Sequence, residues 1–210
     1  MPFDLWLTFA AASLALLLIP GPTVLVVLSY ALSKGRSVAV ASAAGVALGD
    51  LVAMTASLLG LGALVLASAT LFTLLKWIGA LYLVYLGVKL IRSAPTSEAL
   101  DLPAADTVTA ARVFGHTAAV TALNPKSIAF FIAFVPQFIR PEAALAPQFT
   151  ILIATFVTLA AANAFAYALA ASRLRRVIAR PGVLTWITRA GGSALIGMGI
   201  LTATLRRGTA

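Results

Sequence analysis

The stretch LLLIPGPTVLVV, residues 16–27, places two prolines and a glycine inside an apolar run long enough to cross a membrane. Proline removes a backbone hydrogen-bond donor and clashes with the preceding helical turn, and glycine weakens a helix further. Within lipid, each freed backbone group is costly unless another group satisfies it. A helix broken at this position therefore requires partners for its freed groups elsewhere in the protein.

The composition is typical of an integral membrane protein. Of the 210 residues, 61% are hydrophobic and 10% are charged, whereas about a quarter are charged in soluble domains. Cysteine is absent and His116 is the only histidine, which excludes disulfides, thiolate metal sites and multi-histidine metal centres. We therefore expect no metal or other cofactor. The net charge of +9 suits loops that face anionic lipid, and these loops lack the interleaved aromatic residues that nucleic-acid binding would need.

The apolar stretches predict an all-α protein with six membrane-spanning helices, at roughly 20 residues per span. The first stretch follows MPFDLW, which lacks the basic region of a signal peptide, so we expect it to be retained as a helix. A polar segment, 93–111, predicts a cytoplasmic linker between a first half, 1–92, and a second half, 112–210, of one membrane domain. The six expected spans cover about 5–32, 38–64, 71–91, 113–139, 148–171 and 184–205.

The distribution of basic residues predicts the orientation in the membrane. Ten lysines and arginines follow the first, third and fifth spans or precede the next ones, and four lie on the opposite side. Because basic residues accumulate in cytoplasmic loops, both termini are expected outside the cytoplasm. The ten are Lys34, Arg36, Lys89, Arg92, Arg112, Arg173, Arg175, Arg176, Arg180 and Arg189, and the four are Lys76, Arg140, Arg206 and Arg207.

Matching features in the two halves predict inverted three-helix repeats. The first span is interrupted by Pro20, Gly21 and Pro22, and its counterpart, the fourth span, by Asn124, Pro125 and Lys126. Three helices per half is an odd number, so a duplicated half would be inverted in the membrane. Paired interruptions at corresponding positions indicate a transporter binding site.

In such an arrangement the second segments of the two broken helices run in opposite directions from a common midplane. Their N-termini, which carry free N–H groups and partial positive charge, would then face one cavity and bind an anion such as a carboxylate. The alternative is a pair of proline kinks that only shape the packing of the helices.

One acidic residue, Asp50, lies about midway along the second span. A charged side chain there costs about 3 kcal/mol on insertion scales and is expected to face the protein interior. It suits a proton carrier or a cation site, although a neutral acid bonded to a backbone carbonyl is the structural alternative. Lys126 would pair with Asp50, contact a substrate carboxylate or extend to the membrane interface.

Two further candidates are less specific. Asn163 lies in the fifth span and would bind a zwitterion or form an interhelical hydrogen bond. Tyr85, together with Tyr82, would line a cavity or fill space between helices. The GVALG segment, Gly45–Gly49, has the spacing of close helix packing.

Five motifs, taken in order, resemble the LysE/RhtB family of bacterial inner-membrane exporters of lysine, homoserine and threonine. They are the early PGP, the GD of the second span, WIGALYLVYLGVKL, NPKSIAFFIAFVPQF and the glycine-rich last span. The resemblance implies proton-driven export of amino acids or close derivatives, six helices in two related halves, an inner-membrane location and, in many members, homo-oligomers. The functional positions that it implies are Pro20, Gly21, Pro22, Gly49, Asp50, Asn124, Pro125 and Lys126.

The resulting hypothesis is an antiporter in which one carboxylate, Asp50, alternately binds a proton and the substrate ammonium group. An exporter of metal or inorganic cations is a weaker alternative, because hard cations require several oxygen ligands. A membrane-embedded enzyme is also considered, although the sequence contains no HExxH motif and no serine motif with a partner histidine. A scaffold without transport activity would not need a buried acid.

Overall fold

The computed structural model describes residues 1–19, 21–34, 38–67, 69–92, 109–140, 143–178 and 181–204, which form helices and short connections without any strand. The expected all-helical class is confirmed for these residues. Most of the predicted linker, 93–111, lies outside them. The helices are α1 (Phe3–Leu18), α2 (Pro22–Lys34), α3 (Ala39–Ala67), α4 (Ala69–Arg92), α5 (Ala110–Ala122), α6 (Pro125–Ala133), the 3₁₀ helix η2 (Val135–Phe138), α7 (Leu145–Ile178) and α8 (Pro181–Thr204).

Both expected helix breaks are present. The first separates α1 from α2, and the second separates α5 from α6 at Leu123 and Asn124. Each pair of segments is bent by more than 40° across its break. Prolines 22 and 125 open α2 and α6, where the missing N–H would have no helical partner. Pro20 lies outside the described residues.

Several of these helices are long and apolar enough to cross a membrane. Within the described residues, α3 and α7 satisfy this criterion alone, over Ala39–Ala63 and Leu145–Ala171. Each bent pair can also be counted as one span. The first pair is α1 and α2, the second is α5 and the segment formed by α6 and η2, and together they bring the number of candidate spans to four. The chain is therefore a multi-pass membrane protein.

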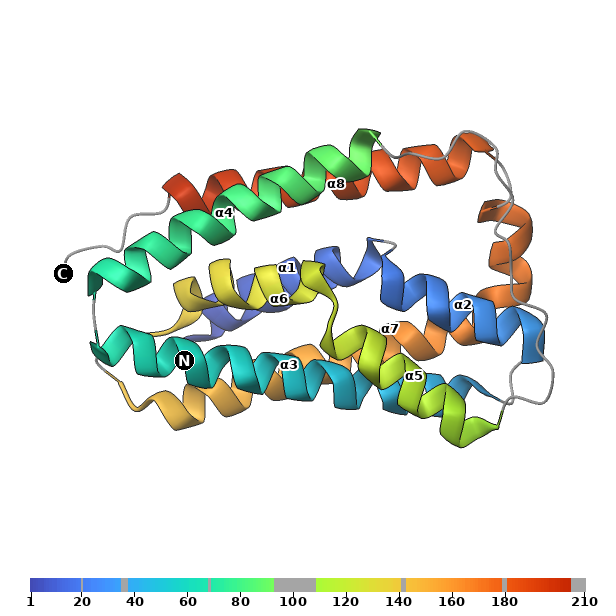
Figure 1. The fold of residues 1–210 in the computed structure, drawn as a ribbon, viewed down its shortest axis with the longest axis horizontal. Coiled ribbons are helices and arrows are strands. Elements are labelled where there is room, and N and C mark those ends of the chain that lie inside the picture. The colour runs from blue at the N-terminus through green and yellow to red at the C-terminus, as the bar shows by residue number, and fades with distance from the viewer. Residues whose placement is uncertain are drawn as a thin grey trace.

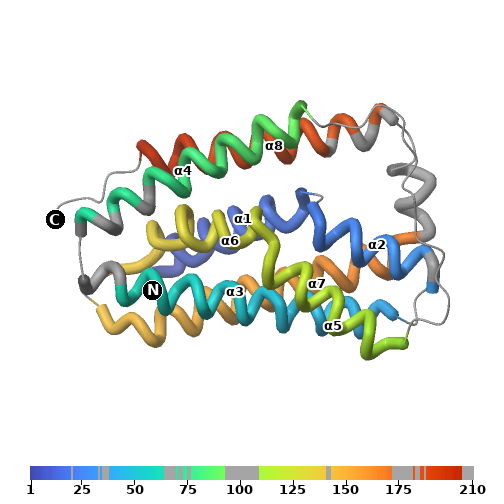
Figure 2. The backbone as a smooth tube through the Cα atoms, in the orientation of Figure 1, coloured from blue at the N-terminus to red at the C-terminus, as the bar shows by residue number. Residues whose placement is uncertain are grey.

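The helices form an elongated bundle in which segments from the two halves of the chain alternate. Figure 1 shows α4 and α8 side by side along one edge, and Figure 2 shows the same pairing in the backbone trace. Opposite them, α3 packs against both α5 and α7, and α7 also contacts α1 and α2. Between these layers, α2 and α6 run from the middle of the molecule toward opposite ends (Figure 1). Both helix breaks thus lie in the interior of the bundle.

An aromatic cluster fixes α6 against α7. Phe130 stacks on Phe134 with ring centroids 5.1 Å apart, and Phe131 meets Phe156 of α7 edge-on at 4.8 Å. The rings of Phe130, Phe131 and Phe156 are fully buried. Because large buried rings contribute most to packing energy, this cluster holds the short helix α6 in place and positions its first turn.

Glycines allow the closest helix contacts. A Cβ added to Gly49 would lie 2.5 Å from the Ala118 carbonyl oxygen of α5, so the GVALG segment packs directly on that helix. On the other side of the bundle, a Cβ on Gly199 of α8 would lie 2.7 Å from the Ala80 carbonyl oxygen of α4. Small residues at such positions let helix backbones approach within the membrane.

Two glycines of α8 offer a matched test of this packing. We expect Gly199→Ala to lower the free energy of unfolding by about 1–3 kcal/mol, because the added methyl group has no room against α4. Gly197→Ala should leave stability unchanged or slightly raised, since no atom lies within 4 Å of its added Cβ. Thermal unfolding of both variants in detergent measures the difference. Equal stability of the two variants would contradict the close α4–α8 contact.

Candidate functional site

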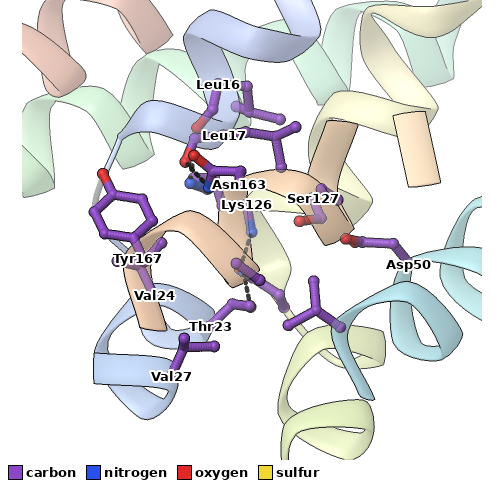
Figure 3. A pocket seen from close by; sticks show the side chains of 15 residues that line it. Leu16, Leu17, Thr23, Val24, Val27, Asp50, Lys126, Ser127, Asn163 and Tyr167 are labelled. Carbon is purple, nitrogen blue, oxygen red and sulfur yellow. Dashed lines mark hydrogen bonds between the residues drawn. The ribbon is translucent and has the colours of Figure 1, made fainter. Parts of the chain in front are cut away.

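A cavity lies between the two helix breaks and is bounded by α1, α2, α3, α6 and α7. Figure 3 shows its lining side chains converging from these helices. The lining residues are Leu16, Leu17, Gly21, Thr23, Val24, Val27, Val46, Asp50, Asn124, Lys126, Ser127, Ala160, Asn163, Ala164 and Tyr167.

The end of α1 forms one wall of this cavity, and side chains from α6 and α7 bind its carbonyl oxygens. The Lys126 ammonium group donates to the carbonyl oxygens of Leu16 and Ile19, at 3.0 and 2.8 Å. Asn163 Nδ2 donates to the Leu17 carbonyl oxygen at 3.1 Å. The Tyr167 hydroxyl group completes the series by donating to the Leu18 carbonyl oxygen at 3.1 Å. Four consecutive carbonyl groups thus have side-chain donors.

These side chains supply the hydrogen-bond partners that the carbonyl groups freed by the first helix break require. The last carbonyl groups of a helix have no helical partners and together carry partial negative charge. An ammonium group is the best donor for them, and Lys126 reaches them from the first turn of α6. Gly21 lies next to this side chain, because a Cβ at that position would be in ordinary van der Waals contact with Lys126 Nζ, at 3.4 Å.

The starts of α2 and α6 form the opposite wall, and a polar network links them. Asn124 caps α6 by accepting a hydrogen bond from the Lys126 backbone N–H at 3.0 Å. Its amide nitrogen donates to the Thr23 hydroxyl oxygen in the first turn of α2, also at 3.0 Å. Thr121 at the end of α5 donates to the same oxygen at 3.3 Å. The positive ends of both half-helices consequently meet at this cavity.

Asp50 reaches the cavity from α3 and is only 2% exposed. Figure 3 shows its carboxyl group directed toward Ser127 and the first turn of α6. Its Oδ1 atom is buried without a hydrogen-bond partner among the described residues. The expected structural alternative, a bond from this acid to a backbone carbonyl, is not what the structure shows. A buried carboxyl group without a hydrogen-bond partner is costly.

Two of the three positions expected for Lys126 are not seen, and the third, contact with a substrate carboxylate, stays a prediction. The described residues contain no ion pair between Lys126 and Asp50, although both side chains line the same cavity. The side chain also does not extend to an interface, because its ammonium group is held at the end of α1. The sequence pattern did not identify the carbonyl groups at the end of α1 as the partners of Lys126.

The structure brings together five of the predicted site residues: Gly21, Asp50, Asn124, Lys126 and Asn163 all line the cavity. The other described candidates do not line it, namely Pro22 and Pro125, which begin helices, and Gly49 and Tyr85.

Helix packing explains why Gly49 and Tyr85 do not line the cavity. The close contact with α5 occupies the face of α3 that carries Gly49. Tyr85 is 56% exposed and packs on Tyr82, because the buried face of α4 is the one that carries Leu83 and Gly87. Neither residue is positioned to contact a ligand in the cavity.

A family model described as LysE type translocator matches residues 14–206. The chain belongs to the LysE family. A homoserine/homoserine lactone efflux protein of Salmonella typhimurium is 34% identical to it, over 98% of this chain and 99% of the relative. A Vibrio cholerae membrane protein is also 34% identical, over 98% and 100%. A leucine efflux protein of Salmonella typhimurium is 31% identical over 65% of this chain and 64% of the relative. No solved structure matches the chain.

Sequence reasoning missed three polar residues of this LysE family cavity: Thr23, Ser127 and Tyr167. A signal for Tyr167 was present, because it follows Asn163 by four residues and therefore shares its helix face. Thr23 follows directly after Pro22, where a hydroxyl group at the start of a half-helix faces the break. Ser127 gave no comparable signal.

Tyr167 of α7, whose hydroxyl group reaches the end of α1, provides a test of the carbonyl contacts. We expect Tyr167→Phe to lower the free energy of unfolding by about 1 kcal/mol, because the Leu18 carbonyl group loses its only side-chain donor. Tyr82→Phe, which removes a hydroxyl group from an exposed residue of α4, should have no effect. Chemical unfolding in detergent compares the two. An equal loss in both variants would show that the Tyr167 hydrogen bond contributes nothing specific.

Proposed function

We propose that this LysE family protein exports amino acids or close derivatives from the cytoplasm in exchange for protons. The observation that carries the proposal is the buried Asp50 carboxyl group, left without a hydrogen-bond partner beside a cavity between two helix breaks. The relatives whose names describe homoserine and leucine efflux support amino acids as the substrate class.

The proposed architecture has six spans, with α4 and α8 as the third and sixth. Each of these helices has 24 residues, which corresponds to a length of about 36 Å. The hydrocarbon core of a bilayer is about 30 Å thick, so both helices are long enough to cross it. Their lengths therefore support two spans beyond the four already described.

The contacts between helices support two inverted repeats. In this scheme α3 corresponds to α7, and the broken pair α1–α2 corresponds to α5–α6. The long helices α3 and α7 each pack against both segments of the broken helix from the other half. Helix α3 contacts α5 and α6, and helix α7 contacts α1 and α2. The remaining helix of each half, α4 or α8, packs on its counterpart. A duplicated and inverted unit produces this reciprocal pattern.

The proposed location is the bacterial inner membrane, with both termini outside the cytoplasm. Figure 1 shows the ends of α2 and α7 and the starts of α5 and α8 toward one end of the molecule, and α4 ends on the same side of it, nearer the middle. Nine of the ten basic residues of the proposed cytoplasmic side lie within two turns of the ends of α2, α4 and α7 or the start of α5, or in the connections beyond them, and Arg189 lies in the third turn of α8. This placement supports a cytoplasmic orientation for that end.

The cavity suits both charged groups of a zwitterion. The substrate carboxylate binds at the starts of α2 and α6, where two positive helix ends meet. The substrate ammonium group binds Asp50, whose Oδ1 atom has no hydrogen-bond partner among the described residues. Thr23 and Ser127, which also line the cavity, supply hydroxyl groups that hold the bound molecule.

Coupling to protons follows from the single free carboxylate. After one half of the protein rocks against the other, a proton from outside neutralises Asp50, the ammonium group loses its partner, and the substrate leaves. When the site faces the cytoplasm again, the proton is released there and the next substrate takes its place. Because one group serves both the proton and the amine, the two exclude each other, and exchange results.

The transport assay uses proteoliposomes that contain the full chain and an imposed proton gradient. We expect Asp50→Asn to abolish proton-driven amino-acid export, because an amide group cannot take up the proton. The matched control is Asp4→Asn, which makes the same change at an exposed position in the first turn of α1 and should transport normally. Undiminished proton-driven export by Asp50→Asn would reject the mechanism.

A further inference from the structure

We propose that the cavity selects amino acids with uncharged side chains, and that Lys126 is the residue that determines this specificity. The inference rests on the proposed export function and narrows its substrate class. It follows from the balance of charge in the cavity and from the hydrogen-bond acceptors that are already occupied there.

The first observation is that two charged residues line the cavity, Asp50 and Lys126. With Asp50 ionised and Lys126 protonated, their charges sum to zero. Lys126 is fixed by two carbonyl groups of α1 rather than by Asp50, so its charge stays in place while Asp50 remains available. A zwitterionic ligand with an uncharged side chain preserves the balance.

A charged side chain on the ligand disturbs this balance in either direction. A basic amino acid would add an uncompensated positive charge beside the fixed ammonium group, and an acidic one would add an uncompensated negative charge. Burial of an unpaired charge is strongly unfavourable. We therefore expect basic and acidic amino acids to bind at least about 100-fold more weakly than neutral ones.

The second observation concerns the available acceptors. A second ammonium group on a ligand would find its best partners at the end of α1, where the carbonyl groups carry partial negative charge. Lys126, Asn163 and Tyr167 already donate to these carbonyl oxygens. Side chains of the protein thus already occupy these acceptors, which would otherwise suit the ammonium group of a lysine ligand.

The remaining lining residues suit a short apolar or hydroxylated side chain. Most of them are aliphatic and come from the end of α1 and from α2, α3 and α7, and their side chains have no group that binds a charge. They are Leu16, Leu17, Val24, Val27, Val46, Ala160 and Ala164.

The first experiment measures ligand stabilisation of the purified full chain by thermal unfolding in detergent. The probes are leucine, homoserine and threonine, compared with lysine, arginine and glutamate at equal ionic strength. We expect at least one neutral amino acid to raise the unfolding temperature. A charged amino acid should need a concentration at least about 100-fold higher to produce the same increase. Equal stabilisation by lysine or glutamate would overturn the inference and leave the export function standing. Stabilisation by no amino acid would overturn both.

The second experiment changes the charge balance. In Lys126→Met the cavity carries a net negative charge, and the α1 carbonyl groups lose their ammonium donor. We therefore expect the affinity for lysine, divided by the affinity for leucine, to be at least about tenfold higher than in the wild type. Lys89→Met, at an exposed position of α4, should keep the wild-type preference, and so should Lys126→Arg, which retains the charge. An unchanged preference in a folded Lys126→Met protein would overturn the role of Lys126. If that variant does not fold, the wild-type ligand series decides the inference by itself.

Discussion

Four carbonyl oxygens at the end of α1 accept hydrogen bonds from side chains of α6 and α7, and the interior of the protein is organised around this contact. In lipid a helix can stop only where its freed backbone groups find partners. Lys126, Asn163 and Tyr167 supply those partners from the second half of the chain. The first broken helix is therefore completed by the other half of the molecule, and the two halves are expected to fold together.

The same contact explains why Asp50 is available. A lysine in the same cavity would ordinarily neutralise a buried carboxylate, but the ammonium group of Lys126 is held by the α1 carbonyl groups instead. The protein thus keeps one positive charge fixed and leaves one acid without a hydrogen bond. In the proposed mechanism this separation leaves Asp50 available to the proton and to the substrate, with which a closed ion pair would compete.

Much of the architecture could be predicted from the chain alone. The apolar stretches located the helices to within a few residues, and PGP and NPK marked both breaks, because proline ends a helix through local geometry. The cavity was predicted less completely. Lys126 was expected to pair with Asp50, to contact a substrate carboxylate or to extend to an interface, and its bonds to the α1 carbonyl groups were not foreseen. Tyr85 was expected to line a cavity or to fill space between helices, and it lies outside the cavity because the α4 face carrying Leu83 and Gly87 is the buried one.

The sequence by itself determined the membrane character, the helical class, the positions of the breaks and the presence of an acid midway along a span. These properties depend on hydropathy and on backbone restrictions that act over a few residues. Only the tertiary structure decided which groups satisfy the broken helix. That choice joins residues more than 100 positions apart, and it depends on which free carbonyl groups the packing brings within reach of each donor.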